Sequence, residues 1–406
     1  MLKVYVCGPT VYNYVHIGNL RPILTMDLIL KAARNLNIDF HFVHNITDID
    51  DKIINKSIQD NKTEKEISTF FTNHYLNILK DLNIDTISKI ELVTDNIDLV
   101  TEFINQIYQN NDAYIVANSV YFDVLKNKDN YGNVSNQKID NMIFEKENDF
   151  KKFKADFALW KNTNVGIKYN SKFGLGRPGW HTECAVLIAK NFNNQTIDIH
   201  GGGMDLTFPH HENENIQYFS LYNKPITKTW LRTGQIMFQE QKMSKSLNNV
   251  ILASDFLKKY SADHLKFIFL LNSFTSTINI DDNLINNIEI IIKRLKNIFF
   301  TKEINGISND IYNIEEYKKI MQFIFDRRFS DFNKSINDLI KEINKNSQLH
   351  NISLLFKVFL DLGFDIAKFN YQVYIPKYKQ WKEFLKQKDY KNADVLREEL
   401  MKQNLI

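Results

Sequence analysis

The sequence predicts an α/β protein in which a Rossmann-type parallel-sheet domain with an insertion is followed by an α-helical bundle and a short helical tail. Strand-like and helix-like segments alternate through the first half of the 406 residues, which is the βαβ order of a parallel sheet. After about residue 290 the strand-like segments stop. Segments with helical hydrophobic spacing then follow one another, which indicates a bundle.

The first four elements have clear hydrophobic patterns. Residues 3–8, KVYVCG, are a short apolar run ending in a glycine turn, and residues 38–47 also read as a strand. Residues 20–36 and 64–82 have the apolar spacing of helices. Because parallel strands end at one edge of a sheet, this order predicts a ligand crevice at their carboxyl ends.

The middle of the chain is less regular. We expect residues 86–150, which are rich in Asn and Lys, to form an irregular insertion with one hairpin at 113–124. The alternating pattern resumes with a helix at 179–192 and a strand at 196–200. The sheet domain therefore continues beyond the insertion.

The last part of the chain predicts helices. Four segments have a helical period, and they are residues 287–300, 314–329, 332–345 and 352–364. A tail at 376–406 mixes basic and acidic residues in a further helical pattern. This part is expected to be a helical bundle with an appended tail.

Composition excludes several classes of protein. The N-terminus lacks the pattern of a signal peptide, and no apolar run approaches the ~18 residues of a membrane span. Two cysteines in 406 residues speak against a disulfide-stapled secreted protein, so a cytoplasmic protein is expected. A net charge of +3 identifies no partner, and a nucleic acid would have to bind local basic patches.

The segment TFPHHENEN at 207–215 raises the possibility of a metal site. Pro209 suits the first turn of a helix, and His210 and Glu214 would then share one face of it. His211 would point elsewhere. An imidazole and a carboxylate are two ligands of the type that zinc uses.

The two cysteines are candidates for the missing ligands. Cys7 lies at the carboxyl end of the first predicted strand, and Cys184 lies in the first turns of the helix that follows GRPGW. Both can face one crevice in a parallel sheet. The alternative stays open at this point, because free cysteines are usually small core residues and His–Glu pairs are usually solvated.

Further motifs give the chain a family resemblance. YNYVHIGN at 12–19 lies between the first strand and the first helix, and KMSKS at 242–246 lies about 225 residues later. Between and around them stand YVCGPTVYNYVHIG, NITDIDDKI, GRPGWHTEC and DIHGGGMDLTFPHHENE. In this order the motifs resemble those of the cysteinyl-tRNA synthetases, a family of class I aminoacyl-tRNA synthetases. The resemblance is dense over residues 3–280 and looser through the bundle and tail.

The resemblance implies one zinc ion per chain, with Cys7, Cys184, His210 and Glu214 as its ligands. It also implies that the zinc binds the substrate thiolate at an open position and does not serve the fold. Serine differs from cysteine by one atom, which an apolar pocket rejects poorly. A hydroxyl is a poor zinc ligand, so coordination would supply the specificity and no editing domain would be required.

The resemblance also implies the remaining site residues. The expected catalytic residues are His16, Asn19, Lys242 and Lys245, of which Lys245 would stabilise the pyrophosphate leaving group. The expected substrate-binding residues are Cys7, Gly8, Thr47, Trp180, His200 and Asp205. The expected ATP-binding residues are His16, Asn19, Gly201, Gly202, Gly203 and Lys245. The cysteine carboxylate is already ionised at neutral pH, so no side-chain general base is expected.

The implied partners are L-cysteine, ATP with Mg²⁺, and tRNA(Cys), with no membrane and with a monomeric protein. The implied domains are a catalytic domain at 1–240 with the insertion at about 86–150, a KMSKS loop and stem-contact region at 241–290, a helical bundle at 291–375, and a shortened anticodon-binding tail at 376–406. Basic residues of the tail would attract phosphate without specifying bases.

Three departures from the family pattern are expected to matter. Asn19 stands where the family motif usually has a second histidine, which removes a possible positive charge. The chain begins almost directly at the first strand, and it stops at KQNLI where longer relatives continue. These departures put the recognition of the anticodon in doubt.

Three rival functions remain. A cysteine:aminosugar ligase of the mycothiol type would share the ATP and zinc apparatus. The segment GLGRPG at 174–179, followed by Asp198, is formally a dinucleotide-binding motif, but the polar KYNSKF before it and Pro178 argue against that use. A non-catalytic, zinc-stabilised RNA-binding module is the third option.

Overall fold

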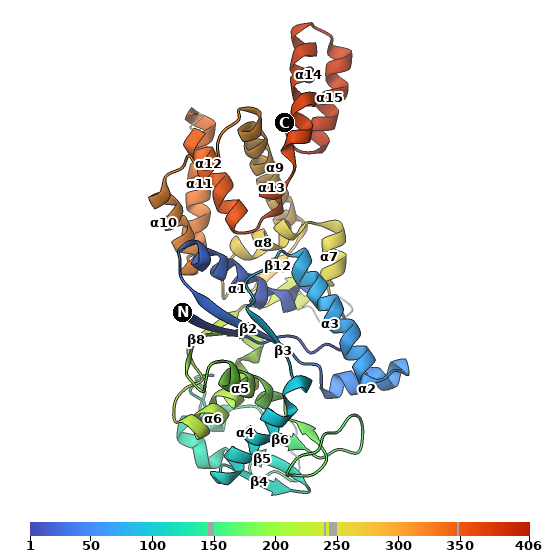
Figure 1. Ribbon diagram of the computed structural model, residues 1–406, viewed down its shortest axis with the longest axis vertical. Coiled ribbons are helices and arrows are strands. Elements are labelled where there is room, and N and C mark those ends of the chain that lie inside the picture. Colours follow the sequence, from blue (N-terminus) through green and yellow to red (C-terminus); the bar gives the residue numbers. More distant parts are fainter. Residues whose placement is uncertain (145–149, 239–240, 243–249, 347–348) are drawn as a thin grey trace. The chain divides into compact units, whose positions relative to one another are not determined.

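The computed structural model describes residues 1–144, 150–238, 241–242, 250–346 and 349–406, which form two compact units (Figure 1). The first unit comprises Met1–Met26, Asp39–Lys80 and Ile84–Gln235. The second comprises Asp27–Ile38, Asp81–Asn83 and Ile236–Ile406. In the part of the chain described, no helix is long and apolar enough to cross a membrane.

A parallel sheet of five strands forms the centre of the first unit. Its order is β3-β2-β1-β8-β9. The strands are β1 (Leu2–Val6), β2 (Phe40–Ile46), β3 (Lys89–Leu92), β8 (Ile197–Gly203) and β9 (Thr227–Thr233). The chain adds β2 and β3 on one side of β1 and later β8 and β9 on the other. The strand order therefore reverses between β1 and β8, and the carboxyl ends of these two strands are where such sheets bind ligands.

Six helices accompany this sheet along the chain. They are α1 (Ile17–Asn35), α2 (Asp51–Asp60), α3 (Glu64–Asp81), α4 (Ile97–Gln109), α5 (Trp180–Asn191) and α6 (Glu212–Tyr222). The helix α3 buries Ile67, Phe71, Tyr75 and Ile78, an apolar stripe at helical spacing. The Rossmann-type sheet and its helices confirm the predicted fold class.

The prediction of irregular structure after residue 86 is wrong for its first part. Residues Lys89–Leu92 form the edge strand β3 of the main sheet, and Ile97–Gln109 form the helix α4. This helix buries Val100, Ile104 and Ile107 at intervals of three and four residues. That helical period was present in the sequence, but the many surrounding Asn and Lys residues obscured it.

A second, antiparallel sheet of the first unit contains the predicted hairpin. Its strands in order are β4 (Ala113–Val116), β5 (Ser119–Phe122), β6 (Phe157–Lys161) and β7 (Arg177–Pro178). The β4–β5 turn uses Ala117 and Asn118, both at positive φ, which matches the right-handed twist of a two-residue hairpin. The short turns η2 (Leu125–Asn130) and η3 (Ile139–Asn141) follow β5.

The second unit is mainly helical. A small sheet in the order β11-β10-β12 is made of β10 (Ile236–Phe238), β11 (Gln241–Lys242) and β12 (Ile278–Ile280). The helices are α7 (Ala253–Lys259), α8 (Ala262–Leu270), α9 (Asp282–Ile304), α10 (Ile314–Phe325), α11 (Phe329–Asn346), α12 (Leu349–Asp361), α13 (Asp365–Lys368), α14 (Ile375–Lys386) and α15 (Tyr390–Lys402). The four bundle helices α9 to α12 were predicted, whereas the three-residue strand β12 was too short to show a pattern.

Buried charges stabilise the second unit through specific partners. Lys266 donates to the Gly363 carbonyl at 2.6 Å, and Lys31 pairs with Asp27 at 2.6 Å. The Asp263 carboxylate accepts the backbone N–H groups of Asp365 and Ile366, both at 2.8 Å, at the start of α13. These hydrogen bonds offset the cost of removing the charged groups from water.

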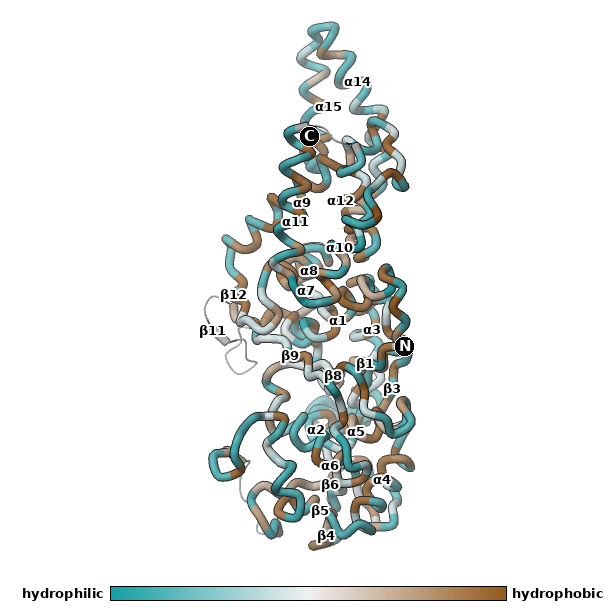
Figure 2. Tube along the Cα trace, turned by 90° about the vertical axis from the view of Figure 1, so that its left-hand side faces the viewer, coloured by the Kyte–Doolittle hydropathy of each residue, from teal (hydrophilic) through white to brown (hydrophobic). Residues whose placement is uncertain are grey.

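The tail is helical, as predicted, and its two helices pack side by side as a hairpin. Its helices α14 and α15 are mostly hydrophilic (Figure 2), and α14 has no buried residue. Its end is nevertheless attached to the bundle, because Leu405 is buried and its carbonyl accepts a hydrogen bond from Asn297 of α9 at 3.1 Å. Most of the basic side chains of the tail are exposed.

Candidate metal centre

The switch point of the main sheet positions the first predicted ligand. Cys7 follows β1 directly, and its backbone N–H donates to the carbonyl of Gly201 in β8 at 3.0 Å. This bond extends the pairing of β1 with β8 by one residue. The Cys7 side chain is thereby held at the carboxyl edge of the sheet.

Four side chains meet there, which we call the first tetrad: Cys7, Cys184, His210 and Glu214. The Cys7 sulfur lies 3.8 Å from the Cys184 sulfur, 3.7 Å from His210 Nε2 and 3.6 Å from Glu214 Oε1. Cys184 Sγ lies 3.7 Å from His210 Nε2, which lies 3.0 Å from Glu214 Oε1. Donor atoms bound tetrahedrally at zinc distances of 2.0–2.3 Å would lie about 3.3–3.8 Å apart, so the tetrad fits one such ion.

Local helix geometry brings three of these residues inward. Cys184 lies in the second turn of α5, and Glu214 lies in the first turn of α6. His210 precedes α6 in a π-helical turn, Thr207–His211, which follows the short turn Met204–Leu206. The i,i+4 spacing of His210 and Glu214 survives this junction, so both reach the same point.

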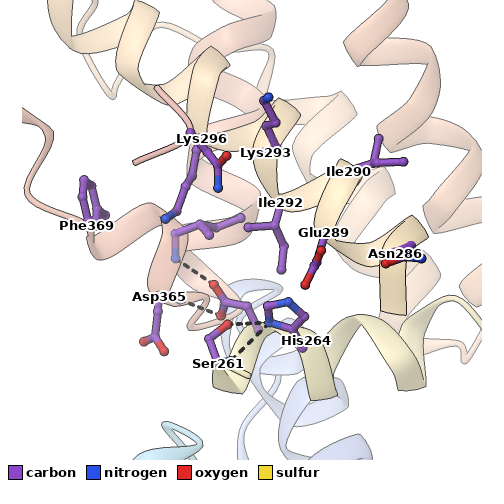
Figure 3. A pocket seen from close by; sticks show the side chains of 13 residues that line it. Ser261, His264, Asn286, Glu289, Ile290, Ile292, Lys293, Lys296, Asp365 and Phe369 are labelled. Carbon is purple, nitrogen blue, oxygen red and sulfur yellow. Dashed lines mark hydrogen bonds between the residues drawn. The ribbon is translucent and has the colours of Figure 1, made fainter. Parts of the chain in front are cut away.

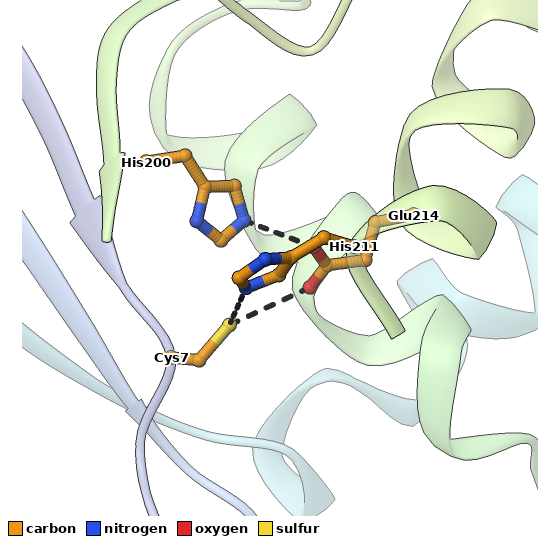
Figure 4. A group of neighbouring side chains, drawn as sticks. All are labelled: Cys7, His200, His211 and Glu214. Atoms are coloured by element: carbon orange, nitrogen blue, oxygen red, sulfur yellow. Dashed lines mark hydrogen bonds and ion pairs between the residues drawn. The ribbon is translucent and has the colours of Figure 1, made fainter. Parts of the chain in front are cut away.

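The expectation that His211 points away from the cluster is wrong. His211 Nε2 lies 3.9 Å from Cys7 Sγ, and the imidazole is fully buried. With His200 it completes a second tetrad, Cys7, His200, His211 and Glu214 (Figure 4). The reason is that Cys7 lies beside the start of α6, where the imidazoles of the adjacent residues His210 and His211 both come within 4 Å of its sulfur.

Mutual electrostatics decide the charges in the cluster. Burial opposes ionisation of Glu214, but His210 and His200 hold its pKa well below the usual value. Burial likewise acts against protonation of His210, but Glu214 and Cys184 raise its pKa to about 10. Burial and the neighbouring Cys184 raise the pKa of the Cys7 thiol, whereas Cys7 and His210 outweigh burial at Cys184 and bring its pKa to about 7.

A hydrogen-bonded chain lies directly behind the two thiols. The buried Asn45 accepts the Gly8 N–H at 2.8 Å and donates to the Thr47 hydroxyl at 3.3 Å. The Thr47 hydroxyl donates to the Glu183 carboxylate at 2.9 Å, and the Cys184 thiol lies 3.9 Å from Asn45 Oδ1. Sequence reasoning selected Gly8 and Thr47 but missed Asn45 and Glu183, although both lie in the motifs NITDIDDKI and GRPGWHTEC.

Aromatic side chains pack against the same cluster. Trp180 stacks on His210 with ring centroids 4.3 Å apart, and His181 Nδ1 lies 3.2 Å from His210 Nδ1. Trp230 of β9 stacks on His211 at 4.7 Å and lies 4.6 Å from His200. Of these packing partners, only Trp180 and His200 were selected from the sequence.

His16 and Asn19 shape the start of α1. The Asn19 side chain accepts the His16 backbone N–H at 3.1 Å, and His16 Nδ1 accepts the N–H of Gly18 at 3.1 Å. This arrangement resembles a capping box, except that the His16 side chain accepts the N–H of the second helical residue and not that of the third. An amide at position 19 therefore has a structural use in this chain, whatever it contributes to nucleotide binding.

The glycines of β8 approach the cluster closely. A Cβ atom on Gly202 would lie 2.9 Å from His211 Nε2, so this glycine gives room to the histidine. Gly201 and Gly203 flank it at the end of the strand, and Asp205 follows in an exposed position. Gly202, which the resemblance assigns to ATP binding, thus leaves room for a protein side chain in this structure.

Of the two expected catalytic lysines, one has its backbone in the described part of the chain. The backbone of Lys242 pairs with Met237 in the small sheet of the second unit. Lys245 lies outside the described residues, as do residues 243–249 altogether. Their roles stay predictions.

The segment GLGRPG does not form a dinucleotide-binding loop. Tyr169 and Gly176 pair in an antiparallel bridge, and β7 continues this pairing with β6. No buried parallel strand precedes the glycines among the described residues of this segment, and the Asp198 carboxylate accepts the Lys3 N–H at 2.8 Å. The geometry gives the nicotinamide alternative no support.

A hollow of about 630 Å³ lies in the second unit between α8, α9 and α13 (Figure 3). Its charged lining is mixed, since Lys293 and Lys296 are opposed by Asp263, Glu289 and Asp365. The hollow therefore shows no preference for an ion of either sign.

Comparisons with known proteins agree on one family. The family described as tRNA synthetases class I (C) catalytic domain matches residues 1–290. A cysteine–tRNA ligase of Mycoplasma mycoides subsp. mycoides SC is 42% identical over 426 residues, covering 100% of this chain and 96% of that protein. A cysteine–tRNA ligase of Mesomycoplasma hyopneumoniae strain 232 is 41% identical, covering 99% of this chain and 97% of that protein.

Solved structures resemble this fold at low sequence identity. A LeuRS of Agrobacterium radiobacter K84, in a ternary complex with tRNA and LeuAMS, has a TM-score of 0.68 at 9% identity over 90% of this chain and 84% of that chain. The methionyl-tRNA synthetase of Mycobacterium tuberculosis has a TM-score of 0.62 at 11% identity over 90% of both chains. At these identities the likeness shows a shared fold.

Proposed function

Because this chain belongs to the cysteine–tRNA ligases, a family of class I aminoacyl-tRNA synthetases that charge tRNA with cysteine, we propose that it forms cysteinyl-adenylate from L-cysteine and ATP and transfers the cysteinyl group to tRNA(Cys). The main support for activation of L-cysteine at a bound zinc ion is the first tetrad. Its four donor atoms converge at the carboxyl ends of β1 and β8, the usual ligand position in such a sheet.

The first tetrad fits zinc by its chemistry as well as its spacing. Two thiols, one imidazole and one carboxylate are ligand types that zinc takes, whereas Mg²⁺ and Ca²⁺ prefer oxygen ligands, which only the carboxylate supplies here. A zinc ion bound there would supply a Lewis acid that accepts the thiolate of L-cysteine. Asn45, through Gly8 and Thr47, would hold the backbone that carries Cys7 in place.

The remaining roles are proposed from the family motifs. Thr47, Trp180, His200 and Asp205 would line the pocket for L-cysteine, and His16, Asn19 and Gly201–Gly203 would contact ATP. Lys245, assisted by Lys242, would stabilise the charge that develops on pyrophosphate, with Mg²⁺ accompanying the nucleotide. Residues 241–290 would contact the acceptor stem and 376–406 the anticodon region, in a monomeric, cytoplasmic enzyme.

The test is ATP–pyrophosphate exchange with the purified full chain, followed by charging of a tRNA(Cys) transcript. Exchange should require L-cysteine and should not be supported by serine at equal concentration. An aminosugar in place of tRNA distinguishes the mycothiol-type ligase, which would accept it. Absence of cysteine-dependent exchange, with zinc supplied and the fold verified, would refute the proposal.

Replacement of Asn45 by alanine should loosen the metal centre without destroying the fold. The change leaves the Gly8 N–H without its acceptor, at a cost of about 1–3 kcal/mol. Zinc affinity should fall roughly 10- to 100-fold, as for other groups that orient metal ligands. Competition with a chromophoric chelator measures the zinc affinity of the variant and of the wild type.

Asn96→Ala is the matched control for Asn45→Ala. Asn96 is equally buried and donates to the Leu92 carbonyl at 2.7 Å, but it belongs to neither tetrad. Its variant should lose comparable stability and keep full zinc affinity. Equal zinc loss in both variants would mean that Asn45 acts only through global stability.

Neutralising the tail should weaken tRNA charging and leave adenylate formation intact. Lys379, Lys382 and Lys386 are exposed on α14, so their replacement by glutamine removes charge without removing packing. Loss of three phosphate contacts would make the negative slope of log K against log salt shallower by roughly two to three units. Filter binding of labelled tRNA at several salt concentrations measures the slope.

The tail variant also has a clear contrary outcome. An unchanged charging rate and salt slope would show that tRNA does not contact this face of the hairpin. Simultaneous replacement of three exposed bundle lysines by glutamine, at Lys318, Lys319 and Lys341, controls for the loss of net charge alone.

A further inference from the structure

The second tetrad shares half of its members with the first. Cys7 and Glu214 belong to both, whereas His200 and His211 belong only to the second (Figure 4). The four donor atoms of the second tetrad lie within 4.8 Å of one another, as do those of the first. The cluster is thus two overlapping sets of possible ligands with a common edge.

The shared residues face both sets at once. Glu214 directs Oε1 to His210 at 3.0 Å and Oε2 to His200 at 3.1 Å. The Cys7 sulfur lies 3.7 Å from His210 and 3.9 Å from His211. A carboxylate and a thiolate placed in this way can bridge two ions, which in two-metal sites lie about 3.5–4 Å apart.

Several donor atoms of the second tetrad have no hydrogen bond. Within the described ranges, both ring nitrogens of His200, Nδ1 of His211 and Oε2 of Glu214 are buried without a hydrogen-bond partner. His200 Nε2 lies 3.1 Å from Glu214 Oε2, but the two atoms do not have the geometry of a hydrogen bond. Buried polar atoms without partners are costly, and a cation would satisfy those that face the shared edge.

We propose that this cluster contains a second metal subsite, in which His200 and His211 bind a divalent cation together with the shared ligands Cys7 and Glu214. Two imidazoles, a thiolate and a carboxylate select a borderline or soft cation such as Zn²⁺ or Cd²⁺ over Mg²⁺ or Ca²⁺. The inference rests on the zinc proposed above for the first tetrad.

The second subsite binds its ion more weakly than the first. The cluster offers three anionic ligands, Cys7, Cys184 and Glu214, to two dications, and the first ion already neutralises much of that charge. Filling the second subsite turns Cys7 and Glu214 into bridging ligands. It therefore changes the coordination of the ion in the first tetrad, which gives a spectroscopic signature.

The test is a titration of chelator-treated, full-length protein with Co²⁺, followed by absorption and by calorimetry. We expect two equivalents per chain, the second at least tenfold weaker than the first. The second equivalent should shift the visible bands of the first. His211→Gln should remove the second equivalent and keep the affinity of the first within about threefold.

Further variants separate the possible failures. His200→Gln removes the other imidazole and should have the same effect, so the test does not depend on one variant folding. His41→Gln removes a histidine outside both tetrads and should keep both equivalents. Saturation of the wild type at one equivalent, or a second equivalent that survives both His200→Gln and His211→Gln, would overturn the second subsite.

The proposed function fails in a different way. Cys184→Ala should abolish the tight equivalent, because Cys184 belongs only to the first tetrad. Absence of any tight equivalent in the wild type would contradict the zinc of the first tetrad itself. A single tight equivalent that Cys184→Ala removes would leave that zinc standing and exclude only the second subsite.

Discussion

Cys184→Ala should lower the zinc affinity of this protein by about 10²- to 10³-fold and abolish measurable cysteine activation. A four-ligand zinc site contributes about 10–16 kcal/mol, so one ligand of four is worth roughly 3–4 kcal/mol. The Cys184 thiol lies 3.8 Å from Cys7 and 3.7 Å from His210, and alanine cannot replace it as a donor. Metal analysis after dialysis and cysteine-dependent pyrophosphate exchange measure the two effects.

Val186→Ala is the matched control for Cys184→Ala. Val186 is buried on the same helix, α5, and its truncation removes apolar contact but no metal ligand. It should cost about 1–2 kcal/mol of unfolding free energy and leave zinc content unchanged. If Cys184 were only a small core residue, both variants would behave alike, with full zinc and full exchange activity.

Gly8→Ala should unfold the metal centre even though it adds a single methyl group. A Cβ atom at position 8 would lie 1.6 Å from the carbonyl oxygen of Asn45, a backbone atom that cannot rotate away. The segments after β1 and β2 are joined by a backbone hydrogen bond, in which the Thr47 N–H donates to the Pro9 carbonyl at 3.1 Å. This leaves no room between them for a side chain at position 8. Relief of the clash must separate these segments and displace Cys7.

The expected cost of Gly8→Ala is at least the 1–3 kcal/mol of ordinary overpacking, with loss of zinc as its most sensitive consequence. Thermal unfolding measures the loss of stability, and metal analysis measures the loss of zinc. Gly174→Ala is the control, since a Cβ atom there meets nothing within 4 Å and only its φ of +93° is unfavourable. Retention of zinc by Gly8→Ala would show that the two segments can separate without moving Cys7.

Hydrophobic periodicity was sufficient to predict the alternating strands and helices, the helical bundle and the tail hairpin. These elements are determined locally, since each buries one face or stripe whose spacing is visible in the chain. The helix Ile97–Gln109 and the strand Lys89–Leu92 had weaker signals, and they were missed. The short strand Ile278–Ile280 forms only because Ile236–Phe238 lies beside it.

The first tetrad could be proposed from the sequence because each member has a local signal. Cys7 ends a strand, Cys184 begins a helix, and His210 and Glu214 are four residues apart. A parallel sheet brings strand ends to one edge, which made a shared site possible, and the resemblance to the cysteinyl-tRNA synthetases then implied this ligand set.

Only the tertiary structure shows that the second tetrad comes together and that Asn45 forms hydrogen bonds behind the two thiols. His211 comes within 3.9 Å of Cys7 because the start of α6 lies at the carboxyl end of β1, and no periodicity in the sequence indicates that contact. Asn45 reaches Gly8 across 37 residues, a contact that depends on the register of two neighbouring strands. Local sequence determines which side chains a helix or strand presents, whereas the packing of those elements determines which buried polar atoms share a partner.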